Sequence, residues 1–216
     1  ELAKKLHCSI LNPKSLVAVN SALVDEKNLV LVLSRNIKIA LNQIKDYEIK
    51  TANNIEQAIE IVKGFDAGVI VSTETVPKNS LQNVAFLKPK TVTVGIGSRK
   101  VVSEKDIFEL VSWALNQLEI PLARVDRLAT VDIKKESESM LKAAKKIGLN
   151  LQFISLEDLG KFSHEDLSDD SKLVMEKIGV GGVCEQVALI VAGKKAKLLL
   201  KKTKAKGVTV AIAEGE

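Results

Sequence analysis

The segment Gly95-Ile96-Gly97-Ser98-Arg99-Lys100 combines two glycines with two adjacent cations and follows an apolar run that predicts a strand. Glycines let backbone N–H groups approach a ligand, and the start of a following helix favours an anion. A dinucleotide-binding fingerprint would need a third glycine where Lys100 stands, and a nucleophile elbow would need one residue between Gly97 and Ser98. The segment therefore predicts either a ligand-binding loop or a tight turn from strand to helix.

A second set of reactive side chains lies in Ala129–Glu136. The apolar pattern predicts a strand over Leu128–Ile133, and side chains alternate along a strand, so Asp132 and Lys134 are expected on one face at its end. A carboxylate beside an ammonium can act as a general base or orient one. The same pair can also form a salt bridge that caps the next helix, and both interpretations stay open.

A third candidate is the glycine-rich turn Gly179–Gly182, which is expected to open a helix with Glu185 in its first turn. Glu185 could be a catalytic acid, or it could simply stabilise the amino end of the helix dipole. Nothing near Cys184 marks it as an activated thiolate, so it is expected to be a packed helix residue.

Seven lysines surround Leu198-Leu199-Leu200 in the stretch Lys194–Lys206. Lysines that flank an edge strand usually face water and discourage aggregation. Lys201, Lys202 and Thr203 could instead contact a carboxylated ligand.

Strand-like and helix-like patterns alternate along the chain, which favours parallel strands covered by helices. The expected fold class is α/β, with two consecutive three-layer α/β units and mostly parallel or mixed sheets. The stretch Thr75–Lys90 is rich in Pro and Asn and is the best candidate linker, which divides the chain into 1–88 and 89–216. A helix is also expected over Ser171–Ile178. Because Glu1–Lys5 reads as the middle of a helix, we expect further protein N-terminal to this chain.

Composition narrows the classes of function. Apolar residues make up 46% and charged residues 27% of the 216 residues, as in ordinary globular proteins. Only four of the 32 basic residues are Arg and aromatic residues are 3%, so side chains that read guanine or stack on single-stranded bases are scarce. The net charge of +5 fits a solvated surface or attraction to a small polyanion. No nucleic-acid partner is expected.

No apolar run reaches the roughly 20 residues of a membrane-spanning helix, and the opening residues carry no secretion signal. The two cysteines and two histidines are scattered, so they cannot form a four-ligand zinc site by themselves. We therefore expect a cytoplasmic protein with reduced cysteines and no contact with a membrane. Any metal is expected to arrive with the substrate.

Taken in order, the segments above resemble one family. They are Val94–Lys100, Leu128–Lys134, Ile147–Leu149, Phe153–Leu159, Ile178–Glu185 and Gly207–Ala211. The pattern resembles the C-terminal domain of the cobalt-precorrin-5A hydrolase family, cobalamin biosynthesis protein G, over about Pro89–Ala213. The segment Leu11–Leu23 resembles the central region of the same family more weakly.

The resemblance implies a step of anaerobic cobalamin (vitamin B12) biosynthesis. In that step the δ-lactone of cobalt-precorrin-5A is opened and acetaldehyde is released, giving cobalt-precorrin-5B. The substrate is a polycarboxylated cobalt-corrinoid small molecule that suits a basic surface. Since this substrate carries its own cobalt, no cofactor and no metal site in the protein are expected.

Lactone hydrolysis needs an activated water, donors for the developing oxyanion, and positioning. On this interpretation Asp132 is the expected base or orients one, Lys134 and Glu185 are further catalytic candidates, and Glu136 remains an alternative base. Contacts with the substrate carboxylates or the oxyanion are expected from Gly95, Gly97, Ser98, Arg99, Lys100, Thr130, Lys201 and Thr203.

Two departures from the family pattern matter. The family usually has Cys where this chain has Ser98, so no thiol chemistry carries over to that position. The family's N-terminal domain, with its Gly/His-rich loop, has no counterpart here. A non-catalytic corrinoid-binding protein, like the small homologue of this domain in the aerobic pathway, and an unrelated nucleotide-binding regulatory module both remain open. A homo-oligomer is compatible with each.

Overall fold

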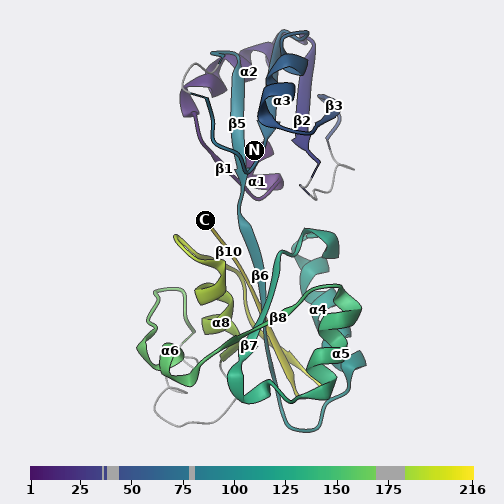
Figure 1. Ribbon diagram of the computed structural model, residues 1–216, viewed down its shortest axis with the longest axis vertical. Coiled ribbons are helices and arrows are strands. Elements are labelled where there is room, and N and C mark those ends of the chain that lie inside the picture. The colour runs from purple at the N-terminus through teal and green to yellow at the C-terminus, as the bar shows by residue number, and fades with distance from the viewer. Residues whose placement is uncertain (36, 38–43, 78–80, 169–182) are drawn as a thin grey trace. The chain divides into compact units, whose positions relative to one another are not determined.

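The chain divides into two compact units, Glu1–Lys90 and Thr91–Glu216. The structure, a computed structural model, describes residues 1–35, 37, 44–77, 81–168 and 183–216 (Figure 1). Each unit is built on a five-stranded sheet with helices packed on both faces. The predicted α/β class with two three-layer units and mixed sheets is confirmed. No helix in the described ranges is long and apolar enough to cross a membrane.

The first unit contains, in chain order, α1 (Leu2–Lys5), β1 (Cys8–Ile10), η1 (Pro13–Ser15), α2 (Leu16–Val24), β2 (Leu29–Ser34), β3 (Glu48–Ala52), α3 (Ile55–Val62), β4 (Ala67–Val71) and β5 (Val84–Pro89). The strand order is β1-β5-β4-β2-β3, in which only β1 pairs antiparallel. The strands β2 and β4 are buried along their whole length, as expected of parallel strands covered on both faces. One face is covered by α1 and α2, and the other by α3.

Local signals place α3 as expected. The side chain of Asn54 caps the helix by accepting a hydrogen bond from the backbone N–H of Gln57 at 2.8 Å. Ile55, Ala58 and Val62 form the buried stripe that holds the helix against the sheet.

The predicted linker is wrong over Val84–Pro89, because these residues form β5. This strand lies between β1 and β4, and its side chains from Val84 to Leu87 are buried. Pro89 is accommodated near the edge, where β5 pairs with the short strand β1. The apolar run was concealed by the surrounding Pro and Asn residues, which are also typical of loops.

The second unit contains β6 (Thr91–Ser98), α4 (Glu104–Gln117), η2 (Leu122–Arg124), β7 (Arg127–Val131), η3 (Asp132–Lys134), α5 (Glu138–Ile147), β8 (Leu151–Ile154), α6 (Leu156–Lys161), α8 (Val183–Ala192), β9 (Lys197–Ala205) and β10 (Val208–Gly215). The strand order is β8-β7-β6-β10-β9; β6, β7 and β8 are parallel, and β10 is antiparallel to both its neighbours. Figure 1 shows α4 and α5 on one face of this sheet and α8 on the other.

Two predicted caps define α4 and α5. Ser103 and Asp106 form the expected capping box at the start of α4. Gly148 ends α5 in the left-handed conformation, with φ of 82°. The helix predicted over Ser171–Ile178 lies outside the described residues.

Candidate functional site

The parallel strands β6, β7 and β8 end at the same edge of the second sheet. Gly95 lies opposite Ala129, and Ala129 lies opposite Gln152. Continuing this register brings the ends of the strands, at Ser98 and Asp132, to the same level. Ligands of open α/β sheets bind beyond the carboxyl ends of the strands, so we expect a ligand site at this edge.

The prediction of a ligand loop that starts at Gly95 is wrong, because Gly95 and Gly97 lie inside β6 and pair with Ala211 and Thr209 of β10. A Cβ on Gly95 would lie 2.0 Å from the carbonyl oxygen of Cys184 on α8. A Cβ on Gly97 would lie 2.5 Å from Oγ1 of Thr209. These glycines therefore admit α8 and neighbouring side chains to the sheet, and their backbone N–H groups form no phosphate nest.

The exposed part of the segment begins at Arg99. Its backbone N–H donates to the carbonyl of Gly207 at 2.9 Å, while the Arg99 and Lys100 side chains are exposed. Just before them, Ser98 is buried, and its Oγ has no hydrogen-bond partner within the described part of the chain. The predicted contacts Ser98, Arg99 and Lys100 thus stand together at the carboxyl end of β6.

Asp132 is placed differently from the sequence prediction. The strand β7 ends at Val131, and Asp132–Lys134 forms the short 3₁₀ turn η3, so Asp132 and Lys134 do not share a strand face. The Asp132 side chain caps neither η3 nor α5. Among the described residues it makes no ion pair, and its buried Oδ1 has no hydrogen-bond partner. The helix-capping salt bridge considered for this residue is therefore not formed.

Two lysines follow the ends of neighbouring strands at this edge. Lys100 comes after β6, and Lys134 comes two residues after Asp132, which follows β7. Burial, and next the positive charge of Lys100, lower the pKa of Lys134. The charge of Lys100 thus acts on Lys134 although the two residues follow different strands. Within the described ranges neither lysine has a carboxylate partner. Two like charges without counter-ions attract anions.

Thr130 also lies at this edge, but its hydroxyl is already engaged. Its Oγ1 donates to the carbonyl of Ile96 at 2.7 Å, which ties β7 to β6. The residue is fully buried, so its contribution is to hold the two strand ends together.

Glu185 has a structural role that corrects its prediction as a catalytic acid. It is fully buried in the first turn of α8. Its carboxylate accepts hydrogen bonds from the backbone N–H and the hydroxyl of Ser168, at 3.0 and 2.8 Å, and from the backbone N–H of Lys202 at 2.7 Å. Lys202 lies where β9 carries an extra residue relative to β10. Glu185 therefore compensates a strand irregularity and anchors a loop.

Cys184 is a packed residue, as predicted. Burial raises the pKa of its thiol to about 12, so the reactive thiolate is not populated near neutral pH. Residues 179–182, which include the predicted glycine-rich turn, lie outside the described residues.

Lys201 and Thr203 lie on β9, the edge strand of the second sheet, as predicted for the lysine run. The strands β6 and β10 both stand between β9 and β7. Thr203 Oγ1 donates to the carbonyl of Lys201 at 3.3 Å. The described structure thus does not bring these two residues together with Asp132.

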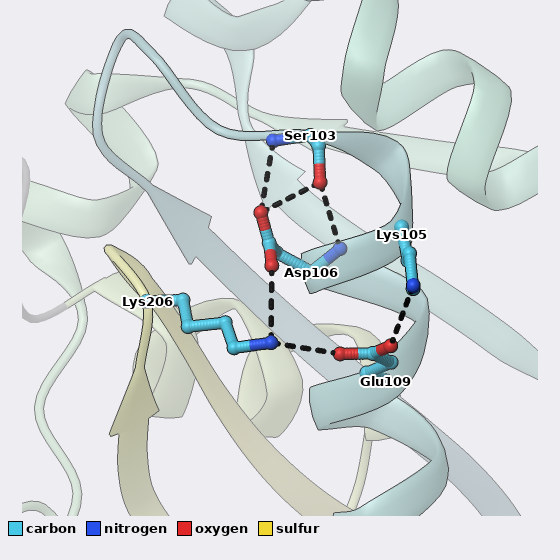
Figure 2. Close-up of polar contacts among 5 residues, drawn as sticks. All are labelled: Ser103, Lys105, Asp106, Glu109 and Lys206. Atoms are coloured by element: carbon cyan, nitrogen blue, oxygen red, sulfur yellow. Dashed lines mark hydrogen bonds and ion pairs between the residues drawn. The ribbon is translucent and has the colours of Figure 1, made fainter.

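Sequence reasoning missed a tether on the neighbouring hairpin (Figure 2). Lys206 stands in the two-residue turn between β9 and β10, and its Nζ lies 3.0 Å from Oε2 of Glu109 and 3.5 Å from Oδ1 of Asp106, both on α4. Gly207 in the same turn accepts the Arg99 N–H. The turn therefore holds the exposed segment after β6 in place. The Lys-Gly pair between two apolar strands was the available sequence signal.

No group of three or more His, Cys, Asp or Glu side chains in the described ranges could hold a metal ion. The residues described at the carboxyl edge of the second sheet instead include Asp132, which makes no ion pair there, and the cations Arg99, Lys100 and Lys134.

The sequence of the second unit is similar to those of known proteins. The family profile described as "Cobalamin synthesis G C-terminus" matches residues 92–213, more than half of the chain and nearly all of the second unit. The chain belongs to this family. The predicted resemblance to cobalamin biosynthesis protein G is thus confirmed.

Two curated relatives are similar over long stretches. The "Cobalt-precorrin-5A hydrolase" of Priestia megaterium is 29% identical over 168 residues, which cover 76% of this chain and 43% of that protein. The "Probable cobalt-precorrin-5A hydrolase" of Methanocaldococcus jannaschii is 34% identical over 134 residues, which cover 59% of this chain and 42% of that protein. The match thus spans less than half the length of either relative.

Solved structures agree on the fold. A cobalamin biosynthesis protein G homologue from Sulfolobus solfataricus has a TM-score of 0.62 at 24% identity, covering 100% of this chain and 59% of that one. CobE, a protein from the cobalamin biosynthetic pathway, has a TM-score of 0.51 at 24% identity, covering 58% of this chain and 91% of that one. The α/β architecture is therefore shared with these two solved structures.

Proposed function

We propose that this chain acts in cobalamin biosynthesis by hydrolysing the δ-lactone of cobalt-precorrin-5A, with release of acetaldehyde and formation of cobalt-precorrin-5B. The observation that carries the proposal is the Asp132 carboxylate, whose buried Oδ1 has no hydrogen-bond partner among the described residues and which follows β7 at the same sheet edge as Lys100 and Lys134 in the family-matched unit. Two relatives named for this hydrolase supply the reaction.

In acyl hydrolysis a water oxygen bonds to the lactone carbonyl carbon, and the bond from that carbon to the ring oxygen breaks, which leaves a carboxylate and a hydroxyl. Acetaldehyde then departs as this hydroxyl loses its proton and its oxygen becomes the aldehyde carbonyl, while the carbon–carbon bond to the macrocycle breaks and leaves its electron pair on the macrocycle. Asp132 is proposed to take the proton of the attacking water, because its Oδ1 has no other partner among the described residues. The ammonium groups of Lys100 and Lys134 would stabilise the oxyanion or hold substrate carboxylates. The buried Ser98 hydroxyl is a further donor at the same level of the sheet.

A further cation at this edge, Arg99, offers a planar fork that matches a carboxylate. Its backbone is fixed by the hydrogen bond to Gly207, so its side chain starts from a defined position. The cobalt belongs to the substrate on this proposal, and the protein residues act on the lactone alone.

A non-catalytic role in binding a corrinoid intermediate remains the second candidate. The pair Lys100 and Lys134 favours it, since two unpaired cations would serve binding whether or not Asp132 performs chemistry. The two candidates differ in whether a covalent bond is broken.

The test is anaerobic incubation of the protein with cobalt-precorrin-5A in ¹⁸O-labelled water, followed by mass analysis of the corrinoid and assay of acetaldehyde. Acyl hydrolysis predicts acetaldehyde together with one solvent oxygen in a corrinoid carboxylate. Acetaldehyde without label in the corrinoid would contradict acyl attack. A substrate that binds but is recovered unchanged would favour the binding role and contradict hydrolysis by this chain.

A further inference from the structure

Three large apolar side chains are exposed just beyond the three parallel strands of the second sheet. Val101 follows β6 and is 94% exposed, Ile133 follows β7 and is 53% exposed, and Leu156 follows β8 and is 45% exposed. These strands are consecutive in the sheet. Neighbouring strands lie about 4.8 Å apart, so the three strand ends spread over roughly 10 Å. Exposed apolar side chains that gather at one edge indicate a binding surface more strongly than scattered ones do.

At two of the three strand ends an unpaired cation is the chain neighbour of the apolar residue. Lys100 precedes Val101, and Lys134 follows Ile133. Neither lysine has a carboxylate partner in the described part of the chain, and the charge of Lys100 acts on Lys134. The edge therefore offers apolar contact and positive charge side by side.

The acidic residues at the third strand end do not cancel this charge. Glu157 is ion-paired with Lys161 within α6. Asp158 shares hydrogen bonds with Ser155, which caps the same helix. Both carboxylates are thus engaged inside α6, and Leu156 stands beside them as an exposed apolar contact.

We propose that Val101, Ile133 and Leu156 form an apolar rim that contacts the face of a macrocycle, while Lys100 and Lys134 bind carboxylates at its periphery. The rim determines specificity, because charge alone would accept any polyanion. This inference rests on the proposed function for the identity of the natural macrocycle. A macrocycle suits this surface because it consists of several linked rings, so it is wide enough to contact the apolar side chains and the lysines that alternate along the edge.

The test measures binding of uroporphyrin, a planar macrocycle with peripheral carboxylates, by fluorescence titration of the whole 216-residue chain. Val101→Ser, Ile133→Ser and Leu156→Ser should each weaken binding about fivefold, because each removes part of the apolar contact. Leu11→Ser is the matched control for Leu156→Ser, since Leu11 is 43% exposed and belongs to the first unit, not to the unit that carries the rim. It should change the affinity less than twofold, by the same reasoning. All these side chains are exposed, so the variants are expected to fold.

Salt separates the two parts of the surface. The loss caused by Leu156→Ser should be the same factor at about 0.05 and 0.5 M NaCl, whereas the loss caused by Lys100→Gln should shrink at the higher salt because charges are screened. Tricarballylate, which carries carboxylates but no apolar face, should compete poorly with uroporphyrin.

Three results would overturn the rim: serine variants that match the Leu11→Ser control, equal competition by tricarballylate, or no binding of uroporphyrin by the wild type up to about 1 mM, the upper limit of typical weak affinity. Acetaldehyde release from cobalt-precorrin-5A, measured on the same proteins, keeps the two proposals apart. Turnover with unaffected serine variants would leave the hydrolase and remove the rim. If the serine variants lose uroporphyrin binding but the wild type does not turn over cobalt-precorrin-5A, the rim would stand and the hydrolase would be removed.

Discussion

Replacing Gly95 by Ala tests how closely α8 lies on the sheet beneath the site. The added Cβ would stand 2.0 Å from the carbonyl oxygen of Cys184, which is 1.4 Å short of the 3.4 Å at which ordinary contact begins. It would also lie 2.9 Å from Cβ and 3.0 Å from the backbone N of Ala188. Two of these three atoms belong to the helix backbone and cannot rotate away, so α8 itself must move.

Overpacking of a well-packed interior costs about 1–3 kcal/mol and occasionally more. Because Gly95→Ala displaces a whole helix, we expect a loss of about 3 kcal/mol of unfolding free energy, at the upper end of that range. With a urea m-value of about 2 kcal/mol/M, the midpoint should fall by about 1.5 M. Trp113 on α4 is the single tryptophan of the chain, so its fluorescence reports on the second unit alone.

Gly160→Ala is the matched control. Gly160 lies in α6 with nothing within 4 Å of an added Cβ, so this substitution should be neutral or stabilising by up to about 1 kcal/mol. A Gly95→Ala protein as stable as the wild type would refute the reasoning. It would mean that α8 does not cover Gly95, and the backbone there would again be available to a ligand.

Three further predictions concern groups around the same edge. Glu185→Gln should cost about 2–3 kcal/mol in the same urea assay, because an amide NH₂ would face N–H donors of Ser168 or Lys202; a loss below about 0.5 kcal/mol would contradict the structural role. The folded protein should not react with a thiol reagent at about pH 8, since the pKa of Cys184 is raised to about 12 and both cysteines are buried; reaction before urea unfolding would contradict this. Lys134 has a lowered pKa, so its ammonium should bind carboxylates near neutral pH and lose them as the pH rises toward its ordinary value of 10.5. Uroporphyrin affinity should fall over that range in the wild type and change less in Lys134→Gln; identical pH profiles would contradict the assignment.

Much of the fold could be predicted because its signals are local. The Asn54 cap, the Ser103–Asp106 capping box and the Gly148 stop each act within a few residues, and each is present in the structure. Continuous apolar runs such as Leu29–Leu33 likewise identify strands that helices cover on both faces.

The errors arose where distant residues decide. Gly95 resembles a loop glycine until α8, which follows about 90 residues later in the chain, is packed upon it. Glu185 resembles a surface residue of a helix start until the irregularity in β9 and the Ser168 loop supply hydrogen-bond donors to its carboxylate. Such contacts depend on tertiary packing, which overrides local propensity.

The candidate site was predicted only in part. The order of strands places Ser98, Arg99, Lys100, Asp132 and Lys134 at one edge, as the rule for open α/β sheets suggests. The alternation rule failed at Asp132, because β7 ends at Val131, two residues before the predicted end at Ile133, and the chain then turns. That turn leaves Oδ1 of Asp132 buried without a partner among the described residues, a property that no local pattern reveals.

The most direct test of the central claim is the rate of acetaldehyde release from cobalt-precorrin-5A by Asp132→Asn, which keeps the side-chain shape and removes the base. Loss of a general base lowers rates by about 10²–10⁴-fold, and we predict a loss of at least about 100-fold. Glu136→Gln, an exposed alternative four residues further on, should retain the wild-type rate within a few-fold. An Asp132→Asn protein that releases acetaldehyde as fast as the wild type would contradict the account and remove Asp132 from the chemistry.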